Sequence, residues 1–345
     1  MVVGMAWCYL MDAHPLLSRH SHLSRRAVLG GLGAMAAGVA GTEFLRGTPA
    51  QAATQLPDKR TWADILVPGY GAWLGAYPGP GNAAPTAYEE MIGRKLDVVM
   101  RYEALDGPWP TPADLALIKA GRWLCVCWSS RLMSNGSSAT WADVAAGRYD
   151  AAITAQAHRL ASVGPIWVGY DNEMDGTARM SRSGPLTNYA AAYRHIQEIV
   201  KPIAPNVIWV WCPTGNNMTQ AVADCYPGNS HVDWICYDPY DPTLSKGGPL
   251  AAYRTFPNWL ASEGIGLRKP LGICETGFHR DLDGTPAAAA WMRALPDALD
   301  QLNIKLWMWF NSYGGLGDTS MAPGSSAAVM LQSVSTKAVL ARPHK

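Results

Sequence analysis

Eight short apolar runs alternate with helical patterns between residues 70 and 310, and this alternation restricts the fold more than any other feature. Nearly continuous apolar runs are typical of strands buried on both faces of a parallel sheet. The runs are Tyr70–Ala76, Leu96–Tyr102, Arg122–Trp128, Ile166–Tyr170, Val207–Trp211, Val232–Tyr237, Pro270–Cys274 and Ile304–Phe310. The helical candidates are Pro112–Ala120, Tyr149–Ser162, Leu186–Val200, Leu250–Glu263 and Ala287–Gln301. Strands that alternate with helices eight times predict a single (β/α)8 barrel, or TIM barrel.

An open, doubly wound parallel sheet is the competing architecture. Such a sheet usually carries a Gly-x-Gly-x-x-Gly turn between its first strand and first helix. The glycine-rich stretch GYGAWLGAYPGPG at 69–81 does not have this spacing. We therefore expect the barrel, without a second domain.

The N-terminus has the pattern of an export signal. The segment SRRAVLG at 24–30 is followed by an apolar run through Ala40 and by TPAQAA at 48–53. Paired arginines, an apolar segment and an Ala-x-Ala stop are typical of a twin-arginine signal, and the apolar segment is too short for a good membrane span. We expect cleavage near Ala52, with 1–52 as extension and signal and 53–345 as the barrel domain. The protein is then secreted or held in the cell envelope, and is not an integral membrane protein.

Net charge and cysteine spacing exclude two classes of partner. The net charge is +1, so the composition has no basic excess that would predict a nucleic-acid partner. Separately, we expect a monomer. The cysteines that follow the signal show neither Cys-x-x-Cys spacing nor a histidine partner pattern, so we expect no zinc. An exported protein can keep disulfides, and we expect one between Cys212 and Cys225, at a strand end and in its following loop. Within apolar strands, four others are expected to act as small buried hydrophobic residues: Cys125, Cys127, Cys236 and Cys274.

Polar residues collect just after the apolar runs, where a barrel builds its active site. Glu173 follows the fourth run and Glu275 follows the seventh. They lie 102 residues apart, or 34 for each of three β/α units, so we expect them to face each other across the barrel mouth. Two carboxylates about 5–5.5 Å apart are typical of retaining glycoside hydrolysis. Two other uses remain open, since an acid can complement a helix dipole and carboxylates can hold a metal, although only His279 among the histidines is expected at the mouth.

Aromatic residues offer a surface for sugars. The chain has 15 Trp and 14 Tyr but only 4 Phe, and such rings suit partly wet clefts as well as ordinary cores. Trp73, Tyr102 and Trp128 are placed at the ends of the first three runs. We expect them to line the cleft, with core packing as the equal alternative for each.

Several segments together resemble glycoside hydrolase family 26, part of a clan of retaining (β/α)8 glycosidases. The similar segments are AAGRYDAAITAQAHRLASVGPIWVGYDNEMDG, NYAAAYRHIQEIVKPIAPNVIWVWCP, VDWICYDPY, KPLGICETG and IKLWMWFN. The resemblance implies Glu173 as acid/base and Glu275 as nucleophile. It also implies that Tyr240 contacts the nucleophile and that Trp309 lies beneath the reacting sugar.

The sequence departs from this family around the sugar site. Asn172 stands where the family has His, and matches the wider clan, in which an Asn binds the sugar 2-hydroxyl. Gly169 stands where the family has Arg, and the segment TARM at 177–180 lacks the usual aromatics. The resemblance therefore supports the mechanism more strongly than it identifies the substrate.

These observations predict a secreted, mannanase-like endo-β-glycosidase that hydrolyses a polysaccharide by double displacement without a cofactor. Glu173 needs a raised pKa to begin as an acid, and apolar walls and the charge of Glu275 would both raise it. Asp171 and Asp175 are expected to support the loops. Two alternatives stay open at this point: a non-catalytic glycan-binding barrel, and a metal-dependent hydrolase on the same fold.

Overall fold

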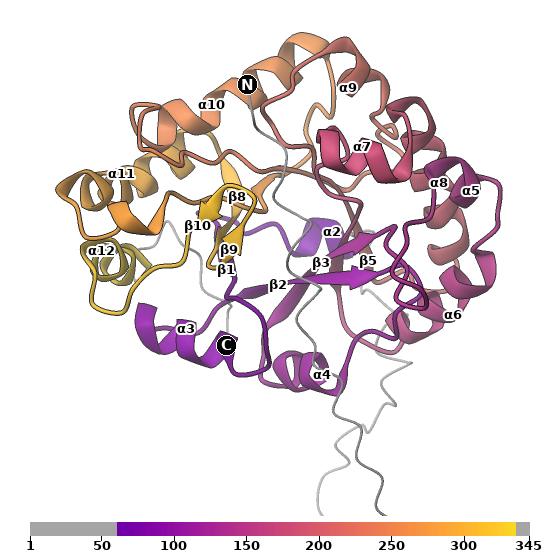
Figure 1. The fold of residues 1–345 in the computed structure, drawn as a ribbon, viewed down its shortest axis with the longest axis horizontal. Helices are drawn as coiled ribbons and strands as arrows, with labels where there is room; N and C mark the ends of the chain where they lie inside the picture. Colours follow the sequence, from indigo (N-terminus) through magenta and orange to yellow (C-terminus); the bar gives the residue numbers. More distant parts are fainter. Residues whose placement is uncertain (1–60, 336–345) are drawn as a thin grey trace, which may run out of the picture.

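The apolar runs form the eight parallel strands of a closed barrel in a computed structural model that describes residues 61–335 (Figure 1). Each strand pairs with the next along the chain, and β8 closes the barrel on β1 in a register from Trp73↔Leu306 to Tyr77↔Phe310. The strands are β1 Trp73–Tyr77, β2 Val98–Ala104, β3 Trp123–Ser129, β4 Ile166–Tyr170, β5 Val207–Trp211, β6 Trp234–Tyr237, β7 Leu271–Ile273 and β8 Ile304–Phe310. The prediction of a (β/α)8 barrel is confirmed.

Helices surround the barrel, and a short hairpin follows β8 (Figure 1). The helices are α2 Trp62–Ile65, α3 Ala84–Ile92, α4 Pro112–Lys119, α5 Trp141–Ala145, α6 Asp150–Leu160, α7 Thr177–Ser183, α8 Tyr189–Val200, α9 Gln220–Asp224, α10 Pro249–Glu263, α11 Pro286–Gln301 and α12 Ser326–Ser335. Two 3-10 turns are η1 Leu186–Asn188 and η2 Arg280–Leu282, and the hairpin strands are β9 Tyr313–Gly314 and β10 Gly317–Asp318. The predicted signal and cleavage site lie outside the described residues.

Alternate residues along each strand face two separate hydrophobic cores, because successive side chains of a strand point to opposite faces. On β3, Leu124, Val126 and Trp128 pack in the layer between strands and helices. Cys125 and Cys127 point into the barrel. The helix layer holds most of the large aromatic side chains, while the barrel interior holds five of the six described cysteines together with Trp167 and Trp234.

The expected disulfide between Cys212 and Cys225 is wrong, since both thiols are free. Cys212 lies in the barrel interior, where its thiol donates to Asp238 Oδ1 at 3.4 Å. Cys225 belongs to the helix layer and donates to the carbonyl of Val222 at 3.1 Å. The two sulfurs therefore lie on opposite faces of the strand wall. The other four cysteines of the barrel are buried and free, as predicted.

Capping ties α4 to the mouth of the barrel. Thr111 and Asp114 form a capping box in which the Asp114 carboxylate accepts from the Thr111 backbone N–H at 2.9 Å. Such a box satisfies backbone donors at the start of a helix. The same carboxylate accepts a hydrogen bond from Arg101 Nε at 2.8 Å. The start of α4 therefore also fixes a charged side chain of β2.

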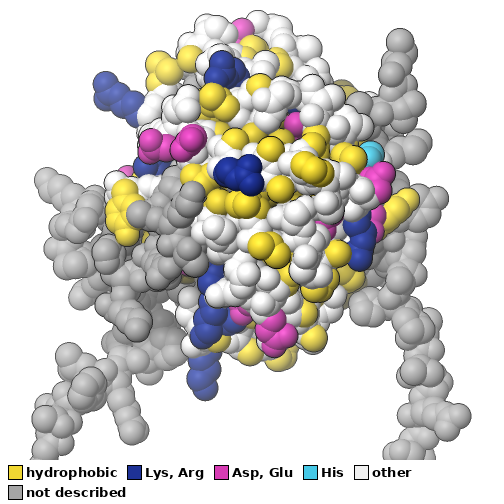
Figure 2. Space-filling view, turned by 90° about the vertical axis from the view of Figure 1, so that its left-hand side faces the viewer, with side chains coloured by type: hydrophobic (Ala, Val, Ile, Leu, Met, Phe, Trp, Pro, Cys, Tyr) yellow, Lys and Arg dark blue, Asp and Glu magenta, His cyan; other side chains and the backbone are white. Residues whose placement is uncertain are grey.

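The outer surface of the described part is mixed in character. None of the helices in residues 61–335 is long and apolar enough to cross a membrane. On the face drawn in Figure 2, charged side chains of both signs are scattered among hydrophobic and uncharged ones. That face therefore carries no dominant charge.

Candidate active site

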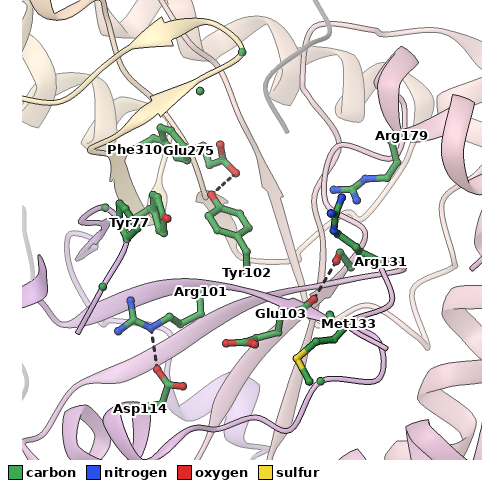
Figure 3. A pocket seen from close by; sticks show the side chains of 18 of the residues that line it. Tyr77, Arg101, Tyr102, Glu103, Asp114, Arg131, Met133, Arg179, Glu275 and Phe310 are labelled. Atoms are coloured by element: carbon green, nitrogen blue, oxygen red, sulfur yellow. Dashed lines mark hydrogen bonds and ion pairs between the residues drawn. The ribbon is translucent and has the colours of Figure 1, made fainter. Parts of the chain in front are cut away.

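A pocket of about 550 Å³ opens where strand ends meet the following loops. Its walls come from the segments after β1, β2, β3 and β8, from α7, and from Tyr240 and Glu275. Figure 3 shows Tyr77 and Phe310 on one side of this pocket and Arg131 and Arg179 on the other. Active sites of (β/α)8 barrels form at this end of the strands, so the pocket is the candidate active site.

Glu275 is a buried carboxylate of the pocket that two phenols hold. It is 2% exposed, and each of its oxygens accepts a phenol hydrogen bond, Oε1 from Tyr102 and Oε2 from Tyr240, both at 2.8 Å. Burial raises the pKa of Glu275 to about 7, while the two phenols and the positive charge of Arg179 lower it. Tyr240 contacts Glu275 and Tyr102 lines the pocket, as expected, while the contact of either residue with a sugar stays a prediction. Donors on both oxygens favour the ionised form and leave the carboxylate in one fixed orientation.

Glu173 lies in the turn after β4 with an unusual backbone. Its φ is +58°, and Asp171 has φ +45°. Residues other than glycine seldom adopt this left-handed region, and such strain is concentrated at functional sites. The Glu173 N–H donates to the carbonyl of Cys212 at 2.7 Å, which ties this turn to the end of β5. The turn brings a Glu173 oxygen within 4.8 Å of one from Glu275, although Glu173 does not line the pocket itself.

Asp171 and Asp175 hold the turn, as predicted. Asp171 is fully buried and accepts from the Ser130 N–H and hydroxyl, from Trp141 Nε1 at 2.7 Å, and from Arg179 in an ion pair of 2.9 Å. Asp175 accepts from the backbone and hydroxyl of Thr214 at 2.8 and 2.6 Å. The two aspartates thus bind the turn to the segments after β3 and β5.

Asn172 points into the barrel wall. It is 1% exposed and is not among the residues that line the pocket. Its Oδ1 would lie 2.2 Å from a Cβ at position 169, so Gly169 is needed for this packing. Within residues 61–335, Asn172 Oδ1 has no hydrogen-bond partner. Its contact with a sugar 2-hydroxyl stays a prediction.

Asp238 is a third carboxyl group at this place. It follows β6, is 1% exposed, and lies with one oxygen within 4.8 Å of oxygens of Glu173 and Glu275. Burial raises its pKa well above the usual value, and the charges of Glu275 and Glu173 raise it further. Like-charged neighbours at short range favour the protonated form of one member of such a cluster.

These three carboxyl groups are also the one cluster in the described part of the chain whose spacing suits a metal ion. Both oxygens of Glu275 already accept from phenols. A protonated Asp238 would be a poor ligand, because metals bind the deprotonated group. The arrangement favours carboxylate chemistry over metal binding.

Three of the aromatic predictions are wrong. Trp309 and Trp128 are fully buried in the helix layer, where Trp309 Nε1 donates to Thr319 at 3.0 Å and Trp128 Nε1 to Leu105 at 3.3 Å. Trp73 begins β1 instead of ending it, and its Nε1 donates to Leu66 at 2.6 Å. None of the three tryptophans lines the pocket.

Sequence reasoning missed several of the residues that line the pocket. Tyr77 ends β1 and stacks on Phe310 at the end of β8, with ring centroids 5.0 Å apart. Tyr77 lies four residues after Trp73, and Phe310 directly follows Trp309. Both rings lie on the inward face of their strands. The charged lining residues were missed as well, since no spacing marked them: Arg101, Glu103, Arg131, Arg179 and Arg182. Burial raises the pKa of Glu103 to about 7, with a further increase from Asp114.

His279 has a structural contact at the mouth. Its Nε2 lies 2.7 Å from the carbonyl oxygen of Leu316, in the β9–β10 connection. The ring nitrogen therefore donates, and it fastens the hairpin to the segment after β7. The residue does not line the main pocket.

Together, barrel and pocket define a class of protein: a (β/α)8 barrel with paired glutamates after β4 and β7. No family model matches the chain. Among solved structures, a GH26 β-mannanase from Bacteroides ovatus is similar with a TM-score of 0.62 and 17% identity, over 85% of this chain and 94% of that one. A modular endo-β-1,4-mannanase from Cellulomonas fimi is similar with a TM-score of 0.56 and 18% identity, over 81% of this chain and 74% of that one. At these identities the likeness concerns the fold, and there it confirms the resemblance seen in the sequence.

One curated relative is closer in sequence. Endoglucanase H of Acetivibrio thermocellus is 30% identical over 220 residues, which are 59% of this chain and 23% of that protein. The chain thus spans less than a quarter of the length of this relative.

Proposed function

We propose that the protein is a glycoside hydrolase that cleaves internal β-linkages of a polysaccharide with retention of configuration. The observation that carries this proposal is the fixed carboxylate of Glu275, with a Glu173 oxygen within 4.8 Å of it. Inverting enzymes need about 6.5–9.5 Å between their carboxyl groups to admit a water molecule, whereas retaining enzymes need about 5–5.5 Å. The short separation supports the retaining mechanism.

In the first step, a Glu275 oxygen bonds to the anomeric carbon as the bond from that carbon to the leaving oxygen breaks. Glu173 gives its proton to the leaving oxygen. Tyr102 and Tyr240 hold the attacking carboxylate in line, since each donates to one of its oxygens. Positioning of this kind lowers the barrier because the reacting atoms are held near the geometry of attack.

In the second step, water attacks the anomeric carbon. Glu173, now a carboxylate, takes a proton from that water, and the bond to Glu275 breaks. The product keeps the original configuration after two inversions. No step needs a cofactor or a metal ion.

The substrate proposed is a β-1,4-linked hexose polymer. Two similar structures are described as β-mannanases, one of them β-1,4-specific, and the curated relative as an endoglucanase. The stacked rings of Tyr77 and Phe310 provide an apolar wall for a pyranose face. We further propose export through a twin-arginine signal, on the pattern of residues 24–53.

Variants of the two glutamates test the proposal on a panel of mannan, glucan and xylan. Glu275→Ala and Glu173→Ala should each lower turnover by orders of magnitude, and azide should rescue Glu275→Ala with formation of a glycosyl azide of inverted configuration. Glu263→Ala, at an exposed glutamate of α10, is the matched control and should keep full activity. Binding of a glycan without any hydrolysis by the wild-type protein would instead support the glycan-binding alternative.

A further inference from the structure

Arg179 is an arginine buried beside the proposed catalytic carboxylates. It comes from α7 and is 6% exposed, yet it lines the pocket. Its Nη1 forms an ion pair with Asp171 Oδ1 at 2.9 Å, and its Nη2 donates to the backbone carbonyl of Asn172 at 3.2 Å. The guanidinium therefore holds the residue pair that directly precedes Glu173.

The cation is permanent. Burial alone would lower the pKa of Arg179, but the charges of Asp171 and Glu173 contribute to holding it above its ordinary value. Burying an unpaired charge costs several kcal/mol, and the pair with Asp171 offsets that cost. Asp171 also accepts from Ser130 and Trp141, so its carboxylate is stabilised by neutral donors as well as by Arg179.

Strand β4 itself has no room for a charged side chain at position 169. Position 169 faces the barrel interior two residues after Trp167, which points inward. A Cβ on Gly169 would meet Asn172 Oδ1 at 2.2 Å, the backbone of β5 lies at 3.4 Å, and no longer side chain fits without displacing Asn172. The positive charge at this wall comes from α7, through Arg179.

We propose that Arg179 is a positioning residue that fixes the turn before Glu173 and places a permanent positive charge in the pocket that Glu275 also lines. This inference rests on the proposed function for its meaning in catalysis. The effect of the Arg179 charge on the pKa of Glu275 can be measured whether or not the protein cleaves a polysaccharide.

Among the groups that act on the pKa of Glu275, Arg179 alone carries a full positive charge. Burial raises that pKa, and Tyr102, Tyr240 and then Arg179 lower it. The other titratable groups coupled to Glu275 are neutral or negative. They are Tyr77, Cys125, Cys127 and Asp238, with Glu173 near by.

Removing the charge should therefore raise the pKa of Glu275. An opposite charge close to a carboxyl group lowers its pKa, and we expect Arg179→Met to move the pKa of Glu275 upward. Arg179→Lys keeps a charge and should restore most of that shift, although it loses the forked contact to Asp171 and the Asn172 carbonyl. Asp171→Asn leaves the Arg179 charge less neutralised and should shift the pKa of Glu275 downward.

Two readouts test this inference on the folded protein. One is ¹³C NMR titration of glutamate carboxyls, with the Glu275 signal assigned by its loss in Glu275→Gln. The other is the acid limb of the kcat/KM profile, which should move in the same direction as the NMR pKa. Arg254→Met, at an exposed arginine of α10, is the control and should change neither.

A purely structural arginine would lower the folded fraction or kcat in Arg179→Met and leave the pKa of Glu275 unchanged, which overturns the inference. If Arg179→Met does not fold, Asp171→Asn and Arg179→Lys test the inference instead. An unchanged or raised pKa of Glu275 in Asp171→Asn contradicts the inference. If the wild-type protein hydrolyses none of the polysaccharides, the proposed function fails, while the NMR titration still decides the effect of Arg179.

Discussion

Glu275 is held by two phenols that reach it from different parts of the barrel. Tyr102 comes from β2 and Tyr240 from the segment after β6, and each donates to one oxygen at 2.8 Å. The sequence predicted both glutamates from their distance along the chain, because the β/α repeat sets that spacing. It did not predict Arg179 or the left-handed backbone of Asp171 and Glu173, since these depend on how loops pack in space.

Replacing either phenol tests how the nucleophile is held. Tyr102→Phe and Tyr240→Phe each remove one hydrogen bond to a charged group, which contributes about 1.5–3 kcal/mol, so kcat/KM should fall by roughly 10- to 100-fold. Since both phenols lower the pKa of Glu275, their loss should raise it and move the acid limb of the pH profile to higher pH. Steady-state kinetics between pH 4 and 9 measures both effects.

The control for these variants is Tyr226→Phe, because that hydroxyl bonds Asn229 at the surface and not the pocket. It should leave the profile unchanged. Wild-type pH limbs in both pocket variants would show that the phenols do not tune Glu275.

At the scale of elements, the strands explain what the sequence could and could not show. Their positions were predictable to within a few residues, because a run such as VIWVW in β5 is apolar throughout. The same uniformity hides which side chains face inward, since a strand buried on both faces has no alternation of polar and apolar residues. The family resemblance placed Trp309 in the cleft, and the apolar pattern of the strand did not show that its neighbour Phe310 faces the barrel interior and the pocket instead.

These adjacent residues of β8 give opposite predictions. Phe310→Ala removes a ring from the pocket wall and should raise KM by roughly tenfold, because aromatic contacts contribute about 0.5–1.5 kcal/mol beyond area burial. Trp309→Leu leaves a cavity in the helix layer and should lower the free energy of unfolding by about 2–4 kcal/mol with KM unchanged. Urea unfolding and saturation kinetics on both variants separate the two effects. A large rise in KM for Trp309→Leu, with Phe310→Ala neutral, would reverse the assignment.

At the scale of the whole molecule, burial of Glu275 at the barrel mouth makes its ionised form unfavourable for folding. The folded state raises the pKa of Glu275 to about 7 from its ordinary value of 4.5. A group whose pKa is higher in the folded state adds stability below its unfolded pKa and loses it as pH rises through the folded pKa. An ionised Glu275 therefore lowers stability above pH 7.

Glu275→Gln tests this cost, since the amide cannot ionise. The variant should unfold at a higher temperature than the wild type at pH 8, by up to about 3 kcal/mol in the free energy of unfolding. At pH 4 this advantage should vanish, because the wild-type carboxyl is then protonated in both states. Thermal unfolding at the two pH values measures the difference, with Glu263→Gln as the exposed control. An equal effect at both pH values would mean that the charge of Glu275 is not the cause.

The central claim is that Glu275 bonds covalently to the sugar, and mass spectrometry of the intact protein tests it directly. A 2-deoxy-2-fluoro glycoside with a good leaving group should add the mass of one fluorosugar unit, and peptide mapping should place it on Glu275. The Glu275→Gln variant should stay unlabelled. An unlabelled wild-type protein that nevertheless hydrolyses the glycoside, or a label on another residue, would contradict the account.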